Sequence, residues 1–107
     1  AAKQGLDLEK VYEVITASAG NSWMFENRMP HVLAGDYAPL SSIEIFVKDL
    51  GIVQDMARAE RYPAPLAAAA LQMYLAASGS GMGRDDDSSL ARLYAGLSGA
   101  QLPEKKD

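Results

Sequence analysis

The chain of 107 residues has no cysteine and one histidine, His31. Without cysteine it can form no disulfide and perform no thiol chemistry, which is typical of a cytosolic protein, so we expect a cytoplasmic location. His31 has no second histidine at metal-binding spacing, so no histidine-based metal site is predicted. The run Asp85–Ser88 lacks the spacing of a calcium loop, and its carboxylates favour a helix N-terminus instead. We therefore expect no metal.

Long apolar runs and basic clusters are also missing. No stretch approaches the ~18 apolar residues that a membrane span needs. The formal net charge is -4, and Lys105–Lys106 is the only pair of adjacent basic residues. Neither nucleic acid nor a membrane surface is therefore an expected partner. The first residues lack the order of a signal peptide and suggest the last turn of a helix that Gly5 ends, so we expect the chain to begin inside a longer protein.

Helical spacing is what the sequence does contain. The residues are 49% hydrophobic and 22% charged, the composition of a globular domain, and no alternating strand pattern appears. The expected helices run from the N-cap Asp7 to Gly20, from Asn21 or Ser22 to about Arg28 before Pro30, from Ser42 to Arg61, from Pro65 to Ser78, and over Ser89–Leu97. The predicted fold class is all-α, a single helical domain of four or five helices around one core.

The helix expected over 42–61 carries Lys48 and Asp49 side by side in an apolar run. On a wheel of ~100° per residue, Lys48 lies on a polar strip with Glu44, Asp55 and Arg58. One interpretation of Lys48 is a surface lysine paired with Glu44, worth only ~0.2–0.5 kcal/mol.

Asp49 does not join that strip. It lies between two apolar patches of the same helix. The patches are Ile43, Phe46, Val47, Leu50, Val53 and Ala57 on one side, and Ile45, Ile52 and Met56 on the other. Asp49 is either a boundary carboxylate that reaches water or a helix N-terminus, or a buried carboxylate that needs a cationic partner. No other residue of the helix is expected to pair with it, so a partner would come from another helix, domain or chain.

Two further stretches raise functional alternatives. The segment "GNSWMFENR", 20–28, gathers polar donors and aromatic side chains at a helix start. It is either a cap with Trp23 and Phe25 in the core, or a corner that lines a ligand site. The glycines of "GSGMG", 79–83, follow a helix and not a strand, so a helix stop and turn are predicted rather than a phosphate loop. No Ser/His/Asp arrangement suggests nucleophilic catalysis.

These residues carry a resemblance to a known family. The triplet "KDL" at 48–50, the spacing to Pro65-Leu66, and "G-x-G-x-x-D-x-S" over 81–88 resemble the C-terminal helical domain of the β-hydroxyacid dehydrogenases. That family includes 3-hydroxyisobutyrate dehydrogenase and tartronate semialdehyde reductase, and its helical domain is like that of 6-phosphogluconate dehydrogenase. The stretch 20–28 is similar to the branch that acts on four-carbon sugar acids, the L-threonate dehydrogenases.

The resemblance implies a two-domain enzyme that uses NAD or NADP. It transfers hydride between the nicotinamide and a 2- or 3-hydroxy acid. A Rossmann domain would precede residues 1–107, which would form the helical C-terminal domain for substrate binding and homo-oligomer formation. The glycine-rich fingerprint and the helix with the catalytic lysine are absent from this sequence, and Lys3 has no matching asparagine. The chain alone is therefore expected to be inactive.

The resemblance also implies roles for single residues. Lys48 matches the family lysine that contacts the cofactor, and Asp49 matches the acidic neighbour of the catalytic lysine, which it would hold charged and oriented. Several family members have phenylalanine where this chain has Ser41, which is compatible with a more polar substrate. Asn21, Ser22 and Trp23 are further candidates for the substrate-binding wall.

A second function class remains open beside the enzyme. The chain could be a stand-alone helical module whose apolar faces dimerise, as its many alanines and methionines would suit. A dinucleotide-binding G-x-G-x-x-G pattern upstream of Ala1 in the gene would favour the enzyme, and a start codon there would favour the module.

Overall fold

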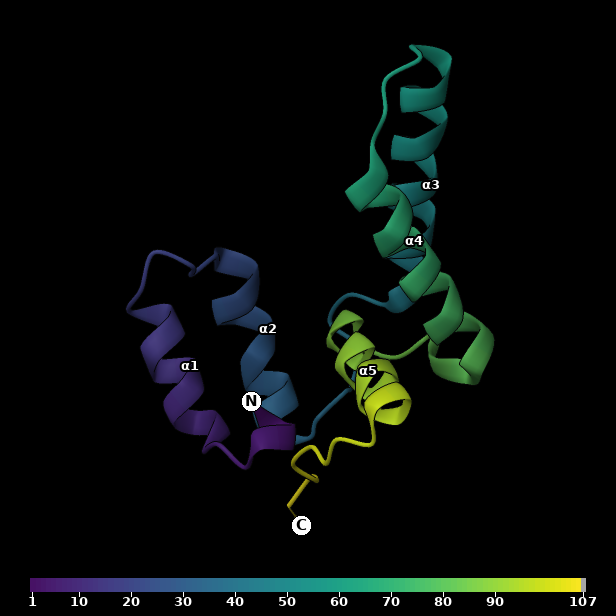
Figure 1. Ribbon diagram of the computed structural model, residues 1–107. Helices are drawn as coiled ribbons and strands as arrows, with labels where there is room; N and C mark the ends of the chain where they lie inside the picture. The colour runs from purple at the N-terminus through teal and green to yellow at the C-terminus, as the bar shows by residue number, and fades with distance from the viewer. Residues whose placement is uncertain (107) are drawn as a thin grey trace. The chain divides into compact units, whose positions relative to one another are not determined.

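The computed structural model describes residues 1–106, and this range contains helices and no named strand (Figure 1). The α-helices are α1 (Leu8–Thr16), α2 (Trp23–Ala34), α3 (Ile43–Ala59), α4 (Pro65–Ala77) and α5 (Leu90–Ser98). Shorter turns are η1 (Ala2–Gln4), η2 (Ser78–Met82) and η3 (Asp87–Ser89). The all-α prediction with about five helices is confirmed. In the described range no helix is long and apolar enough to cross a bilayer.

The helices group into two compact units. The first unit contains Ala1–Tyr37 and the chain from Ala91 on, and the second contains Ala38–Leu90. Val32 is buried in the first unit, and Ile43 and Ala77 are buried in the second. The expectation of one core around all the helices is therefore corrected, because each unit packs mainly on itself.

Helix α1 begins where the sequence predicts and ends earlier. Asp7 is the N-cap, and its carboxylate accepts hydrogen bonds from the amides of Glu9, at 3.0 Å, and Lys10. The predicted end at Gly20 is wrong, because the helix stops at Thr16. The Thr16 hydroxyl bonds the Tyr12 carbonyl at 2.8 Å, and the Ser18 hydroxyl bonds a carbonyl of the preceding turn. Such hydroxyls compete with the backbone donors that would continue a helix.

Helix α2 continues through Pro30, contrary to the prediction that it would end near Arg28. A proline lacks the N–H that would bond the carbonyl four residues earlier, here that of Glu26. The Tyr12 hydroxyl of α1 donates to the Glu26 carbonyl at 2.9 Å. The neighbouring helix thus supplies the donor that Pro30 lacks, so the break that proline usually causes is avoided.

The first unit also holds the C-terminal tail. Gly35 ends α2 with φ +62°, a left-handed conformation that favours glycine. A Cβ atom at Gly35 would come within 2.5 Å of the Lys105 backbone nitrogen. Lys105 also pairs with Asp36, at 3.7 Å between Nζ and Oδ1. Backbone contact and ion pair together hold the tail against the end of α2.

In the second unit α3 and α4 form a helical hairpin (Figure 1). Pro65 occupies the first position of α4, as predicted, since its fixed φ suits a helix start. The rings of Phe46 and Tyr74 stack with 5.0 Å between centroids. At the turn, the Gln54 side chain donates to the Ala64 carbonyl at 3.2 Å. These contacts fix which face of α3 meets α4 and hence which side chains α3 presents elsewhere.

Candidate functional site

Lys48 and Asp49 form an ion pair on α3. Lys48 Nζ lies 3.2 Å from Asp49 Oδ1, and the two side chains are 66% and 54% exposed. The expectation that Asp49 has no partner in its own helix is therefore wrong. Side chains on neighbouring positions leave the helix about 100° apart, but a lysine is long enough to bend back. The predicted partner of Lys48, Glu44, bonds the Ser78 hydroxyl instead.

Asp49 lies within an exposed apolar stripe of α3. The stripe consists of Ile45, Ile52, Val53 and Met56, whose exposed fractions are 40%, 50%, 43% and 65%. The opposite face of the helix packs against α4, with Ile43 fully buried. The position of Asp49 beside apolar residues is as the wheel predicts, but its burial is not observed, because nothing in the described chain covers the stripe. Within the described chain, Asp49 is thus a boundary carboxylate that reaches water.

Ser41 belongs to the same unit as Lys48 and Asp49 and precedes α3. Its side chain is half-buried, and its backbone carbonyl accepts a hydrogen bond from the Asp87 amide at 2.6 Å. The residue is therefore anchored by its backbone. Its side-chain hydroxyl has no hydrogen bond to a described residue.

The candidates Asn21, Ser22 and Trp23 belong to the first unit, at the start of α2. Ser22 is the N-cap, with its hydroxyl accepting from the Phe25 amide at 3.0 Å. Asn21 donates to the Glu26 carboxylate at 3.4 Å, while its carbonyl oxygen has no partner among residues 1–106. The capping interpretation is thus confirmed for Ser22.

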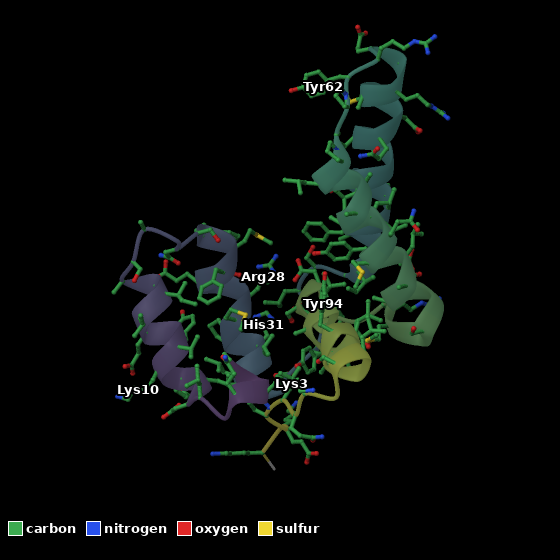
Figure 2. All side chains as sticks on the ribbon, viewed as in Figure 1. Lys3, Lys10, Arg28, His31, Tyr62 and Tyr94 are labelled. Carbon is green, nitrogen blue, oxygen red and sulfur yellow. The ribbon has the colours of Figure 1, made fainter. Side chains whose placement is uncertain are left out.

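Trp23 does not lie in a core, although the capping interpretation of this stretch expected both Trp23 and Phe25 there. Its side chain is 68% exposed, and the guanidinium of Arg28 lies over its ring, 5.8 Å from the centroid. Arg28 is labelled in Figure 2. Phe25 turns the other way and stacks on Tyr12 at 5.9 Å. The exposed Trp23 with Arg28 is a feature that sequence reasoning missed. Their separation of five residues gave no signal, because such positions lie about 140° apart around a helix.

Tyr37 and Arg92 form a second stacked pair in the first unit, with the guanidinium 4.2 Å from the ring centroid. Burial raises the pKa of the Tyr37 hydroxyl, and the positive charge of Arg92 partly opposes that rise. The hydroxyl has no hydrogen-bond partner within residues 1–106. Tyr37 therefore keeps its proton at neutral pH.

The acidic run at 85–88 does not form a metal site. Asp86 and Asp87 are buried, and Asp86 caps η3 by accepting from the Ser88 amide. No group of three or more His, Cys, Asp or Glu side chains suited to a metal ion occurs in the described part of the chain. The helix-start interpretation of these aspartates is confirmed for Asp86.

A family model for the NAD-binding region of NADP-dependent 3-hydroxyisobutyrate dehydrogenase matches residues 1–94. The chain belongs to this family. The resemblance to the β-hydroxyacid dehydrogenases is thereby confirmed.

Relatives within the family are similar over nearly the whole chain. An L-threonate dehydrogenase of Cupriavidus necator is 53% identical over 105 residues, which are 98% of this chain and 34% of the relative. A 3-sulfolactaldehyde reductase of Escherichia coli K12 is 34% identical over 96 residues, 86% of this chain and 32% of the relative. A solved structure of 3-hydroxyisobutyrate dehydrogenase from Salmonella typhimurium is 55% identical with a TM-score of 0.85, covering 87% of this chain and 33% of that one. The chain spans about a third of the length of these relatives.

The exposed ammonium of Lys48 on α3 has hydrogen-bond donors of the kind that a nicotinamide cofactor accepts from. A lysine ammonium carries three N–H donors, and Lys48 directs its charge toward one carboxylate at 3.2 Å. Since the side chain is 66% exposed, donors remain for an amide, hydroxyl or phosphate oxygen of such a molecule. This donor set agrees with the NAD-binding character of the family.

Proposed function

We propose that residues 1–107 are the helical C-terminal domain of an NAD(P)-dependent dehydrogenase of 2- or 3-hydroxy acids, and that the substrate is a four-carbon sugar acid of the L-threonate type. The observation that carries this proposal is the 53% identity to L-threonate dehydrogenase over 98% of the chain. The 34% identity to 3-sulfolactaldehyde reductase is lower, so we favour the sugar acid.

Lys48 and Asp49 have separate roles in this proposal. Lys48 donates a charge-assisted hydrogen bond to the cofactor, a contact worth about 1.5–3 kcal/mol. Asp49 orients a lysine supplied by the rest of the enzyme and favours its charged form. Their mutual pairing at 3.2 Å would then be exchanged for these partners when the site assembles.

When bound, the nicotinamide supplies the hydride acceptor or donor. The residues of this chain orient the reactants and control charge. In the oxidation direction the hydroxyl-bearing carbon of the substrate loses a hydride and its oxygen loses a proton. The lysine beside Asp49, in its neutral form, takes that proton and becomes the charged form that Asp49 stabilises. In the reverse direction the charged lysine gives the proton to the carbonyl oxygen and becomes neutral.

Four polar or aromatic residues are the candidates for substrate binding in this proposal. Ser41 offers a hydroxyl in place of the phenylalanine of several family members. Asn21 and Trp23 provide an amide oxygen without a partner in the described range and an exposed ring. Ser22 is occupied as a helix cap, so its part is to hold Asn21 and Trp23 in place.

The exposed apolar stripe around Asp49 is an argument for contact with another domain. Four exposed apolar residues around a carboxylate suit a surface that another part of the protein covers. We propose that the preceding Rossmann domain covers it, and that the enzyme is a cytoplasmic homo-oligomer.

The test is a substrate panel on the complete gene product that contains this chain. L-threonate, D-erythronate, 3-hydroxyisobutyrate, glycerate and 3-sulfolactaldehyde are assayed with NAD and with NADP by following the reduced nicotinamide. We expect the highest kcat/KM with L-threonate. Absence of turnover with every acid and both cofactors would overturn the proposal. Asp49→Asn is expected to lower kcat more than cofactor affinity.

The stand-alone dimerisation module is a second candidate, supported by the same exposed stripe. The two candidates differ in one measurement. A complete gene product that binds neither NAD nor NADP in calorimetry but dimerises through α3 would favour the module.

A further inference from the structure

Asp86 is a fully buried carboxylate, with none of its surface exposed. Its Oδ1 accepts a hydrogen bond from the Leu40 amide at 3.0 Å. Its Oδ2 accepts from the Ser88 amide at 3.1 Å and from the Ser88 hydroxyl. One side chain thereby ties the segment before α3 to the segment before α5, 46 residues apart in sequence.

Backbone hydrogen bonds surround this tie. The Asp87 amide donates to the Ser41 carbonyl at 2.6 Å, and Ser42 and Asp86 form an isolated antiparallel bridge. The amides of Ile43 and Glu44 donate to the carbonyls of Asp85 and Gly83, each at 3.0 Å.

These bonds replace a conventional helix cap. The first amides of a helix lack partners within the helix, and a serine at the N-cap usually bonds one of them. Ser42 occupies the N-cap of α3, but its side chain makes no capping bond. The first turn of α3 is therefore held by the 83–87 loop.

Glu44 adds a second tie to the same first turn. Its carboxylate bonds the Ser78 hydroxyl at the end of α4. A Cβ atom at Gly83 would overlap that carboxylate, so any other residue there would require the Glu44 side chain to shift. Gly81 has φ +94°, a conformation that other residues rarely adopt. The glycines and Asp86 of the 81–88 motif thus together shape a loop that packs against the first turn of α3.

We propose that Asp86 is a positioning residue for Lys48 and Asp49. Both residues lie on α3 within about two turns of Ile43, and the helical repeat fixes the directions of their side chains relative to the first turn. The direction in which the two charges project therefore follows from how the first turn is held. The catalytic meaning of this positioning rests on the proposed function, whereas the tie between Asp86 and the first turn does not.

The first test is hydrogen exchange of the complete gene product without cofactor. Asp86→Asn keeps the shape of the side chain but replaces one of its two acceptor oxygens by an NH₂ group. That group cannot accept a hydrogen bond, so either the Leu40 amide or the Ser88 donors lose their acceptor. We expect the amides of Ile43 and Glu44 to exchange about tenfold faster, the effect of losing hydrogen bonds to a charged group. Amides in the middle of α1 should keep their rates. Unchanged rates at Ile43 and Glu44 would overturn the inference.

The second test measures cofactor affinity by calorimetry. Asp86→Asn is expected to raise the Kd for the cofactor about tenfold, similar to the loss of one charge-assisted bond at Lys48. The double variant with Lys48→Ala should bind no more weakly than Lys48→Ala alone, because both changes remove the same contact. If the two substitutions weakened cofactor binding additively, Asp86 would not act through Lys48, and the proposal would be overturned.

Asp7→Asn is the matched control. Asp7 is also an aspartate cap that accepts two backbone amides, but it lies in the first unit, on α1. This control should lower stability while leaving the cofactor Kd within about twofold. An equal rise in Kd for both variants would mean that Asp86 acts through general stability only.

One outcome separates this inference from the proposed function. Faster exchange at Ile43 and Glu44 in a protein that binds no nicotinamide cofactor would overturn the proposed function and the catalytic role of Asp86, yet support the tie itself. If Asp86→Asn does not fold, Ser88→Ala removes the hydroxyl donor to Asp86 Oδ2 and should shift the same amides in the same direction, by a smaller factor.

Discussion

The exposed Lys48–Asp49 ion pair is weak enough for either residue to exchange it for another partner. At 3.2 Å and more than half exposed, the pair is worth at most about 1 kcal/mol in water. A cofactor oxygen or a second lysine therefore displaces it at little cost. The exposure that makes the pair weak is what makes both residues available.

Replacing Lys48 by alanine tests its contact with the cofactor. We expect the Kd for the preferred nicotinamide cofactor to rise at least tenfold, because a charge-assisted hydrogen bond worth about 1.5–3 kcal/mol is lost. The unfolding free energy should change by less than about 0.5 kcal/mol, as for other exposed positions. Lys10→Ala is the control, since Lys10 is also an exposed, paired lysine, on α1. Equal Kd values for both variants would remove Lys48 from the site.

Tyr37 provides a pH-dependent prediction. Its pKa is raised above 10.0 by burial, so the folded chain holds the proton more tightly than the unfolded chain does. The stability that this provides is present below the unfolded pKa and is lost as the pH rises through the folded pKa. Tyr37→Phe should therefore remove part of the fall in unfolding free energy above about pH 10. Urea unfolding at several alkaline pH values measures this.

The control for Tyr37 is Tyr94→Phe, a tyrosine of α5 that is 52% exposed. It should leave the alkaline fall unchanged. At neutral pH, Tyr37→Phe should be neutral or stabilise by up to about 1 kcal/mol, because it removes a buried hydroxyl without a partner in the described chain. A large loss of stability at neutral pH would show that the hydroxyl is bonded.

At the scale of the helices, the continuity of α2 depends on α1. The Tyr12 hydroxyl bonds the Glu26 carbonyl because Pro30 cannot. Tyr12→Phe should cost about 0.5–1.5 kcal/mol of unfolding free energy. In a Pro30→Ala background the amide of residue 30 takes over the carbonyl, so the same change should cost less. A double-mutant cycle by urea unfolding gives the difference, and equal costs in both backgrounds would contradict this account.

Sequence patterns predict those helix features that neighbouring residues determine. Asp7 and Pro65 act within one turn, so their positions at helix starts could be predicted. The extent of α2 could not, because the donor that bypasses Pro30 comes from another helix. The tie at Asp86 could not either, since its partner Leu40 is 46 residues away.

The candidate site shows the same division. The wheel places Asp49 beside apolar residues, which depends only on helix geometry. Whether those residues are buried depends on what covers them, and the chain leaves Ile52 half exposed. Likewise, helical spacing puts Glu44 one turn before Lys48, but packing directs Glu44 to Ser78.

For the whole molecule, the question is whether another domain covers the apolar stripe around Asp49. From the described chain alone, Ile52→Glu should change the unfolding free energy by less than about 0.5 kcal/mol, because the side chain already meets water. If a Rossmann domain covers the stripe, the same change buries an unpaired carboxylate and should cost about 2–4 kcal/mol. We expect the larger cost in the complete gene product.

The matched control for Ile52→Glu is Arg58→Glu, on the polar strip of the same helix. The Arg58 side chain is 86% exposed and pairs only loosely with Asp55, at 3.8 Å. This variant introduces the same charge away from the stripe and should stay within about 0.5 kcal/mol of the parent protein. Chemical unfolding of both variants gives the comparison. Small changes in both would show that the stripe stays in water, and Asp49 would then lack the domain contact that its proposed role requires.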